Sequence, residues 1–272
     1  MASAGVFDRL LSVAAGALSE LVSGGGPRNG KLGDTAPACV KGFDVDPRFD
    51  RPLYTRAEVA LHLGLPATTL GDWLRSGALA AGSGGRGEPT ITFAGLVETH
   101  MLRQLRRTGL SLQAIGEAAV ALRSRAGRQY PLAWAGLAHD GRDLLIEIAA
   151  EGREAGWERI RDSQGGLPGV LRRGSAAIGW SDDGYAATLR LVIYHDIDVI
   201  VDPSQSRGQP VIAGSGIRVE DVLDRIRTGA SYREIASKFD LEDFEVEALV
   251  RPHIRPPAFR RSPSAEPQDP LI

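Results

Sequence analysis

Residues 53–79 read LYTRAEVALHLGLPATTLGDWLRSGAL, and this stretch decides how the N-terminal half of the chain folds. Thr55 and Glu58 have the spacing of a capping box, in which a hydroxyl and a carboxylate satisfy the first backbone N–H groups of a helix. Gly64 permits the left-handed backbone that ends many helices, and Pro66 suits the first turn of a second helix. Two short helices joined by a tight glycine turn form a helix-turn-helix. The apolar residues that would pack the pair together fall at helical spacing: Val59, Ala60, Leu63, Leu65, Leu70, Trp73 and Leu74.

The stretch resembles the winged helix-turn-helix of MerR-type regulators, including the Trp of the second helix and the Gly-x-Leu that follows it. The resemblance covers roughly residues 53–122. Thr90–Phe93 is predicted to form a wing strand, and residues 105–115, LRRTGLSLQAI, are close to a phrase of that family. The resemblance implies a winged helix domain over residues 51–128 that binds duplex DNA.

Charge supports contact with DNA in this domain. Residues 51–128 hold 10 Arg, no Lys and 5 acids, a balance of 10 − 5 = +5, whereas residues 129–202 hold 7 Arg and 12 acids, a balance of 7 − 12 = −5. Gly71 stands where the family often has Arg, and phosphate repels the neighbouring Asp72. A winged helix that only contacts a partner protein is therefore the alternative. The residues predicted to contact DNA are Thr68, Thr69, Arg75, Arg86, Arg103 and Arg107.

The totals describe an ordinary globular chain of two or three small domains. The 272 residues are 43% hydrophobic and 24% charged, with a net charge of −2. Cys39 is the single cysteine, which excludes an intrachain disulfide and a thiolate metal cluster. No apolar run approaches the ~18 residues of a membrane span, and the first residues contain Asp8 and no basic region typical of a signal peptide. We therefore expect a cytoplasmic protein without a membrane partner.

The flanking and central segments differ in composition. Residues 1–50 are predicted to be a flexible N-terminal arm and linker, because residues 24–50 are rich in Gly, Pro and Asp. In residues 129–201, Asp140-Gly141 and Asp183-Gly184 each lie between apolar runs, which indicates two hairpins and a small antiparallel sheet. The alternation over residues 195–202 is typical of a half-buried strand and favours a strand over a metal site. No metal and no cofactor is expected.

Residues 202–250 carry a second resemblance, to the small domain known as domain of unknown function 433. The matching phrases are Asp202-Pro203, the run GQPVIAG at 208–214, and the run SYREIA at 231–236. Many members of that family are antitoxins of the VapB kind, paired with PIN-like ribonuclease toxins. This chain departs from the pattern at Gly216, where many members have Arg.

The spacing of apolar and capping residues predicts a three-helix domain for the same segment. Val219, Val222, Leu223 and Ile226 line one helix face, and Ser231-x-x-Glu234 is a second capping box. The remaining residues expected in the core of this domain are Ile235, Ala236, Phe239, Phe244, Ala248 and Leu249. The outline is again that of a helix-turn-helix, but an acidic one, so packing and DNA contact are both open as its role.

Residues 251–272 form a Pro-rich tail that is predicted to be disordered. It holds 4 Arg, Glu266 and Asp269, a balance of 4 − 2 = +2. PIN-like nucleases hold metal ions with acidic side chains, so a cationic tail suits such a cleft. The residues predicted to contact the toxin are therefore Arg251, Arg255, Arg260 and Arg261. The alternative is that the toxin docks on the folded domain at 202–250.

These observations predict an α+β protein with an N-terminal winged helix-turn-helix, a small antiparallel β segment and a C-terminal three-helix, helix-turn-helix-like domain. The expected function is a DNA-binding antitoxin of a type II toxin-antitoxin system that neutralises a PIN-like ribonuclease and autoregulates its operon as a homodimer. The alternative is a MerR-like transcriptional regulator with residues 129–200 as the effector domain. The sequence contains no nucleophile elbow, metal-ligand spacing or phosphate loop, so we do not expect an enzyme.

Overall fold

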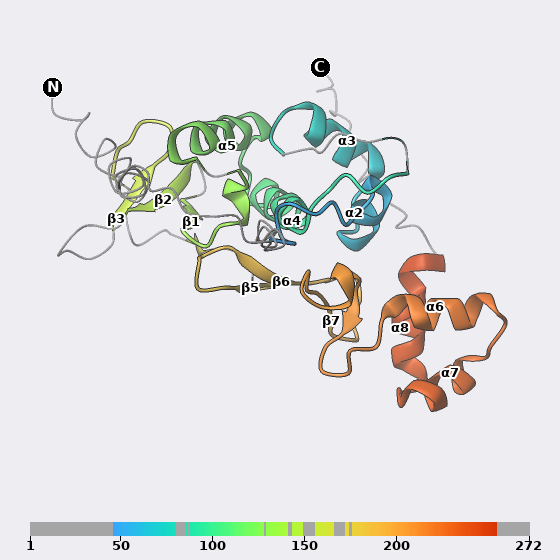
Figure 1. Ribbon diagram of the computed structural model, residues 1–272. Helices are drawn as coiled ribbons and strands as arrows, with labels where there is room; N and C mark the ends of the chain where they lie inside the picture. Colours follow the sequence, from blue (N-terminus) through green and yellow to red (C-terminus); the bar gives the residue numbers. More distant parts are fainter. Residues whose placement is uncertain are drawn as a thin grey trace, which may run out of the picture. The chain divides into compact units, whose positions relative to one another are not determined.

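The computed structural model describes residues 46–79, 85, 87–127, 129–140, 143–148, 156–165, 172–173 and 176–254. These residues all belong to one compact unit, Asp44–Ile272. Within them the fold is α+β, with seven α-helices and two four-stranded antiparallel sheets (Figure 1). No helix of this described part has the length and apolar character needed to cross a bilayer. The predicted arm lies outside the described residues up to residue 45.

Residues 46–50, which we expected to be linker, are instead packed into the fold. The ring of Phe49 stacks on Tyr130 at 5.9 Å between centroids and meets Tyr185 edge-on at 4.8 Å. The Tyr130 hydroxyl donates a hydrogen bond to the Phe49 carbonyl at 3.4 Å. The linker therefore ends earlier than its composition predicted.

The first two helices of the described part are α2 (Arg56–His62) and α3 (Ala67–Arg75), as the sequence predicted. The capping box is confirmed: the Glu58 N–H donates to the Thr55 hydroxyl at 3.2 Å, and the Glu58 carboxylate accepts from the Thr55 N–H at 2.7 Å. Gly64 takes a φ of +57° in the turn between the helices.

The predicted wing strand at residues 90–93 is wrong. Only Ile91 pairs, in an isolated bridge with Tyr54. Thr92 is already the N-cap of the next helix, α4, which begins at Phe93, because its hydroxyl accepts the Gly95 N–H at 3.1 Å. A helix start therefore takes the place of a strand.

Helix α4 (Phe93–Arg107) is the centre of the N-terminal half, with ten consecutive buried residues from Phe93 to Leu102. It is followed by α5 (Leu112–Ala126) and the short 3-10 helix η1 (Pro131–Ala133). Glu98 of α4 is fully buried, and its carboxylate lies 3.3 Å from the Arg123 guanidinium of α5. The same carboxylate accepts the Leu132 N–H of η1 at 3.1 Å. One buried acid thus ties α4, α5 and η1 together.

The two Asp-Gly hairpins are confirmed, but they lie in two different sheets rather than one. The first sheet has the order β3-β2-β1-β4 and the second the order β5-β6-β7-β8. Asp140-Gly141 joins β1 to β2, and Asp183-Gly184 joins β5 to β6. The strands of the first sheet are β1 (Leu137–His139), β2 (Leu144–Ile148), β3 (Gly156–Arg159) and β4 (Arg172–Arg173). Those of the second are β5 (Ile178–Trp180), β6 (Ala186–Arg190), β7 (Val199–Val201) and β8 (Val211–Ile212).

The second sheet crosses the boundary that the sequence suggested at residue 202. Strand β8 belongs to the segment expected to be helical, and it pairs with β7 through Ile200 and Val211. Strand β7 is also shorter than predicted, because residues 195–198 form turns rather than extended strand. The short 3-10 helix η3 (Ser206–Gly208) lies between β7 and β8.

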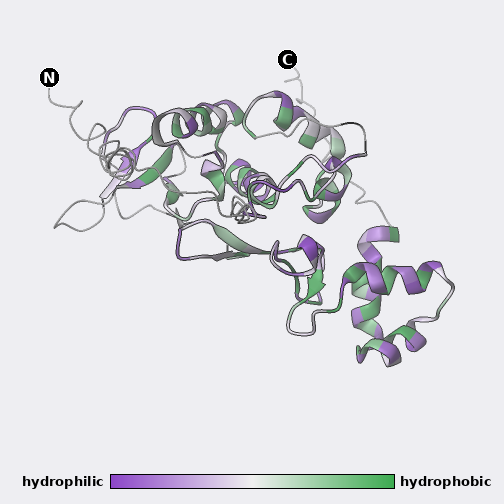
Figure 2. Cartoon of the chain, in the orientation of Figure 1, coloured by the Kyte–Doolittle hydropathy of each residue, from purple (hydrophilic) through white to green (hydrophobic). Residues whose placement is uncertain are grey.

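Three helices complete the described chain: α6 (Val219–Arg227), α7 (Tyr232–Phe239) and α8 (Asp243–Ile254). Figure 2 shows hydrophobic and hydrophilic residues alternating along these helices, as expected where one face packs and the other meets water. The second capping box is confirmed by the Ser231 and Glu234 bonds at 2.8 and 3.3 Å. The core of the three helices consists of Val219, Val222, Leu223, Ile235, Ala236, Val246, Ala248, Leu249 and Val250.

Two expectations about this region are wrong. Helix α8 continues through Pro252 to Ile254, so Arg251 lies on a helix and not in a tail. Phe244, expected in the core, is 57% exposed. Side-chain bonds also hold the end of α8: Arg251 lies 3.5 Å from Asp196, and the His253 ring lies 3.0 Å from the Tyr194 hydroxyl.

Candidate nucleic-acid and partner interfaces

The outer face of α3 carries the residues predicted to read DNA. Leu70 and Trp73 are buried and fix the inner face, which leaves Thr68 and Arg75 exposed and Thr69 half-buried. The Arg75 side chain is 77% exposed and pairs with Asp72, which is 60% exposed. An ion pair this exposed contributes little to stability. Arg75 can therefore easily exchange Asp72 for another anion.

The other predicted DNA-binding arginines fall in three different settings. The Arg103 guanidinium donates to the carbonyl of Leu63, the C-cap of α2, and burial lowers its pKa. Arg103 therefore supports the helix pair from inside. Arg107 is exposed on the last turn of α4, and Arg86 lies outside the described residues. Of the predicted set, the structure brings Thr68 and Arg75 to one face and uses Arg103 internally.

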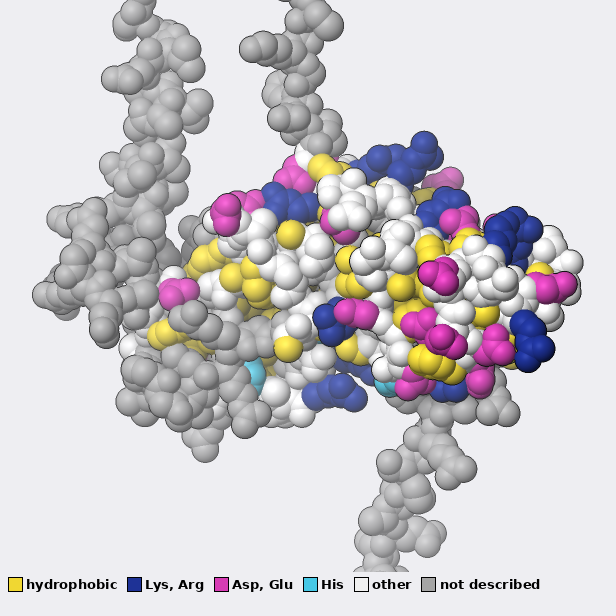
Figure 3. Space-filling view, turned by 90° about the horizontal axis from the view of Figure 1, so that it is seen from below, with side chains coloured by type: hydrophobic (Ala, Val, Ile, Leu, Met, Phe, Trp, Pro, Cys, Tyr) yellow, Lys and Arg dark blue, Asp and Glu magenta, His cyan; other side chains and the backbone are white. Residues whose placement is uncertain are grey.

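Helices α7 and α8 form a second helix-turn-helix arrangement, with Asp240 in the left-handed conformation at the turn (φ 54°). In a DNA-reading motif of this kind, the N-terminal residues of the second helix face the bases. Here those positions are acidic and exposed: Glu242, Asp243 and Glu247. Figure 3 shows acidic side chains gathered about a small hydrophobic patch over the C-terminal helices. Such a surface repels phosphate.

Phe244, together with these acids, is the feature that reasoning from sequence missed. It lies directly after Asp243, in the first turn of α8. Helical spacing assigned it to the core beside Ala248 at i+4; the predicted Ala248 and Leu249 are buried, but Val246 takes the place expected for Phe244. The signal available in the sequence was the run of acids at 242, 243, 245 and 247, because a helix face so charged has to meet water.

The arginines predicted to contact the toxin also lie in different parts of the chain. Arg251 is exposed on α8 and pairs with Glu247 at 3.1 Å and with Asp196 at 3.5 Å. Arg255, Arg260 and Arg261 lie outside the described residues. Arg251 thus compensates acids within the folded part of the chain.

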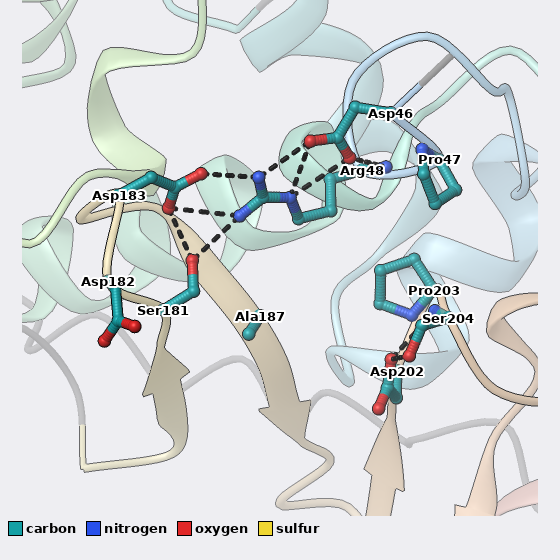
Figure 4. Close-up of a pocket in the computed structure, with 10 residues that line it drawn as sticks. All are labelled: Asp46, Pro47, Arg48, Ser181, Asp182, Asp183, Ala187, Asp202, Pro203 and Ser204. Atoms are coloured by element: carbon teal, nitrogen blue, oxygen red, sulfur yellow. Dashed lines mark hydrogen bonds and ion pairs between the residues drawn. The ribbon is translucent and has the colours of Figure 1, made fainter. Parts of the chain in front are cut away.

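A second charged cluster lines an open depression of about 710 Å³ (Figure 4). The guanidinium of Arg48 lies between two carboxylates: it contacts Asp46 at 2.7 Å and Asp183 at 3.1 Å, and it donates to Ser181 at 2.9 Å. Hydrogen bonds from Arg48 lower the pKa of both carboxyls. Because the guanidinium is surrounded by partners, this cluster fastens the chain before α2 to the β5–β6 hairpin and offers no free cation.

Two histidines are held neutral in the core of the N-terminal half. Burial, with a smaller effect of His253, lowers the pKa of His62 to about 4. Burial, with Arg103 and Arg107, lowers the pKa of His100 to about 4. No group of three or more His, Cys, Asp or Glu side chains among the described residues has the arrangement of a metal site.

Comparison with known proteins gives a consistent set of relatives. Residues 199–251 match the family described as "Protein of unknown function (DUF433)". The chain is 31% identical over 221 residues to "Putative antitoxin VapB45" of Mycobacterium tuberculosis, covering 72% of this chain and 91% of that protein. It is 27% identical over 224 residues to "Uncharacterized protein Rv2308" of the same organism, covering 76% and 92%. The crystal structure of Rv2018 from Mycobacterium tuberculosis aligns with a TM-score of 0.55 at 26% identity, over 75% of this chain and 99% of that one.

Proposed function

The chain belongs to the family of the relative named "Putative antitoxin VapB45", and from this premise we propose that it is the DNA-binding antitoxin of a type II toxin-antitoxin system. It neutralises a PIN-like ribonuclease toxin and represses its own operon. The observation that carries the proposal is the 31% identity to that relative across 72% of this chain. The DUF433 match at residues 199–251 covers α6, α7 and most of α8.

DNA binding is assigned to the helix pair α2–α3, as a MerR-like helix-turn-helix without the predicted wing strand. Support comes from the confirmed capping box and glycine turn, from the exposed Thr68 and Arg75 on α3, and from the +5 balance of residues 51–128. Thr69, Arg107 and Arg86 border the same interface in this proposal. Two copies of the chain bind a palindromic operator, since two-fold readers place one recognition helix in each half-site.

Arg75 gives the sharpest test of DNA binding. Arg75→Ala is expected to weaken binding to the DNA upstream of the gene about tenfold and to lower the salt slope by about one, because one phosphate contact is lost. Asp72→Asn is expected to act in the opposite direction, because it removes the charge that repels phosphate and frees Arg75. Fluorescence anisotropy over a salt series measures both changes.

The matched control is Arg233→Ala, which removes another exposed arginine, from α7. It should bind the same DNA as the wild type does. If Arg75→Ala and Asp72→Asn also bind like the wild type, α3 does not contact DNA. Sedimentation of the DNA complex in the same experiment counts the chains, and a single copy per palindrome would contradict the dimer.

Toxin neutralisation is assigned to the C-terminal part. Two surfaces are available: the arginines that follow α8, namely Arg255, Arg260 and Arg261, and the folded three-helix group itself. Because α8 ends at Ile254, truncation after Ile254 separates them without damage to the helix. Removing residues from 251 onward would delete the Arg251–Asp196 and His253–Tyr194 contacts as well.

A further inference from the structure

Phe244 is a large aromatic side chain left in water in the first turn of α8; the other large apolar residues of this helix are buried except Ile254, its last residue, which is 64% exposed. Phe244 is 57% exposed, whereas Val246, Leu249 and Val250 are at most 1% exposed. A single exposed apolar residue needs no explanation by itself. The charged residues around Phe244 are what indicate a role for its exposed ring.

The residues next to Phe244 on α8 form an acidic border. Glu242 lies directly before the helix, and Asp243 and Glu247 lie in its first turn and a half; all three are exposed, and Glu247 pairs with Arg251. Asp243 and Glu247 are four residues apart, and like charges at this spacing repel each other. Packing of the three-helix group requires none of these charges, because its core faces the other way. We call Glu242, Asp243, Phe244 and Glu247 the α8 face.

The chemistry of this face selects its partner. Phosphate is repelled by the three acids, so nucleic acid is a poor ligand. An aromatic side chain bordered by charge is the usual composition of a protein hot spot, where the ring enters a pocket and the charges lie around it. The complementary surface is an apolar pocket bordered by Lys and Arg.

We propose that the α8 face docks on the basic surface with which the toxin holds RNA, and that it acts as an acidic substitute for the RNA backbone. This inference rests on the proposed antitoxin function. A ribonuclease must bind a polyanion, so cationic side chains border its RNA path. An acidic helix is attracted to the same side chains, and Phe244 supplies the apolar contact that phosphate lacks. Docking there excludes RNA, and charge complementarity speeds the encounter.

The test uses the ribonuclease encoded beside this gene, purified without its metal, and the full-length chain. Phe244→Ala is expected to bind it roughly 30-fold more weakly, as truncation of an aromatic hot spot does. The double variant Glu242→Gln/Asp243→Asn is expected to lose affinity mainly through a slower association rate and to show a weaker salt dependence. Calorimetry and surface plasmon resonance give the two readouts.

Matched controls come from the same chain. Val120 on α5 is 55% exposed, so Val120→Ala removes exposed apolar surface elsewhere. Glu117→Gln/Asp182→Asn removes two exposed acids that lie outside the α8 face. Both controls should bind the toxin within twofold of the wild type, and a non-cleavable single-stranded RNA at saturation should weaken wild-type binding.

Each other outcome overturns the proposal. Phe244→Ala could bind the toxin as tightly as the wild type, with tight binding lost only on truncation after Ile254. The contact would then belong to the arginines that follow α8, and the antitoxin function would still hold. No competition by RNA would place the face elsewhere on the toxin. A change in self-association of Phe244→Ala would identify a second copy as the occupant, and weaker duplex binding would identify DNA. If the wild-type chain does not bind the toxin at all, the antitoxin function fails together with this inference.

Discussion

Arg123→Ala is expected to lower the free energy of unfolding by about 3 kcal/mol, since removing one partner of a buried ion pair leaves the other charge poorly compensated. The Glu98 side chain is fully buried, and Arg123 lies 3.3 Å from it. The same guanidinium donates to the carbonyls of Gly77 and Ala78 at 3.2 and 3.3 Å, just after α3. The substitution therefore loosens both the core and the end of the helix that we assign to DNA.

Urea unfolding followed by circular dichroism measures this effect. Arg107→Ala removes an exposed arginine from the same half of the chain and should shift the free energy of unfolding by less than about 0.5 kcal/mol. Adding Glu98→Met to Arg123→Met should recover much of the loss, because an apolar pair needs no charge compensation. A loss below about 1 kcal/mol for Arg123→Ala would contradict the importance of the pair.

Acidification from pH 7 to 4.5 is expected to cost several kcal/mol of stability through His62 and His100. Both are buried, and their pKa values of about 4 lie below the ordinary 6.5. The unfolded chain therefore takes up these protons first, so stability is complete above pH 6.5 and is lost as the pH falls toward 4. Each pKa unit corresponds to about 1.4 kcal/mol. The full shift of one histidine is thus worth about 3 kcal/mol.

Chemical denaturation at pH 7, 6, 5 and 4.5 gives the slope directly. His62→Gln should remove a clear part of the pH dependence, whatever its effect on stability at pH 7; burial also lowers the pKa of His253, which contributes to the remaining slope. An unchanged slope in His62→Gln would mean that this ring is not neutral in the folded state. The range stops above pH 4, where Asp46 and Asp183 begin to take up protons in the unfolded chain.

Local patterns in the sequence predicted the local structure well. The capping boxes at Thr55 and Ser231 and both Asp-Gly hairpins formed as expected, because each depends on residues within a few positions of one another. The two hairpins could not be assigned to separate sheets from sequence, since strand partners such as Ile200 and Val211 are chosen by tertiary packing.

The predictions from sequence failed where contacts with distant parts of the chain determine the structure. Phe244 has the right spacing for the core, but the packing of α8 against α6 and α7 buries Val246 in its place, beside the predicted Leu249. Arg251 reads as the start of a Pro-rich tail, but its contact with Asp196 belongs to a helix that continues through Pro252. For the candidate interfaces, sequence identified the exposed Arg75 and Thr68 of α3 and missed the α8 face.

The proposed antitoxin assignment is tested most directly by the ribonuclease activity of the toxin that we propose as the partner of this chain. The toxin, its metal ion and a fluorescent RNA are mixed with increasing amounts of this protein, and the cleavage rate is recorded. We expect cleavage to fall to the background level near a one-to-one ratio of the two chains, with a stable complex in sedimentation. Full cleavage at a tenfold molar excess of this protein, without a complex, would contradict the account.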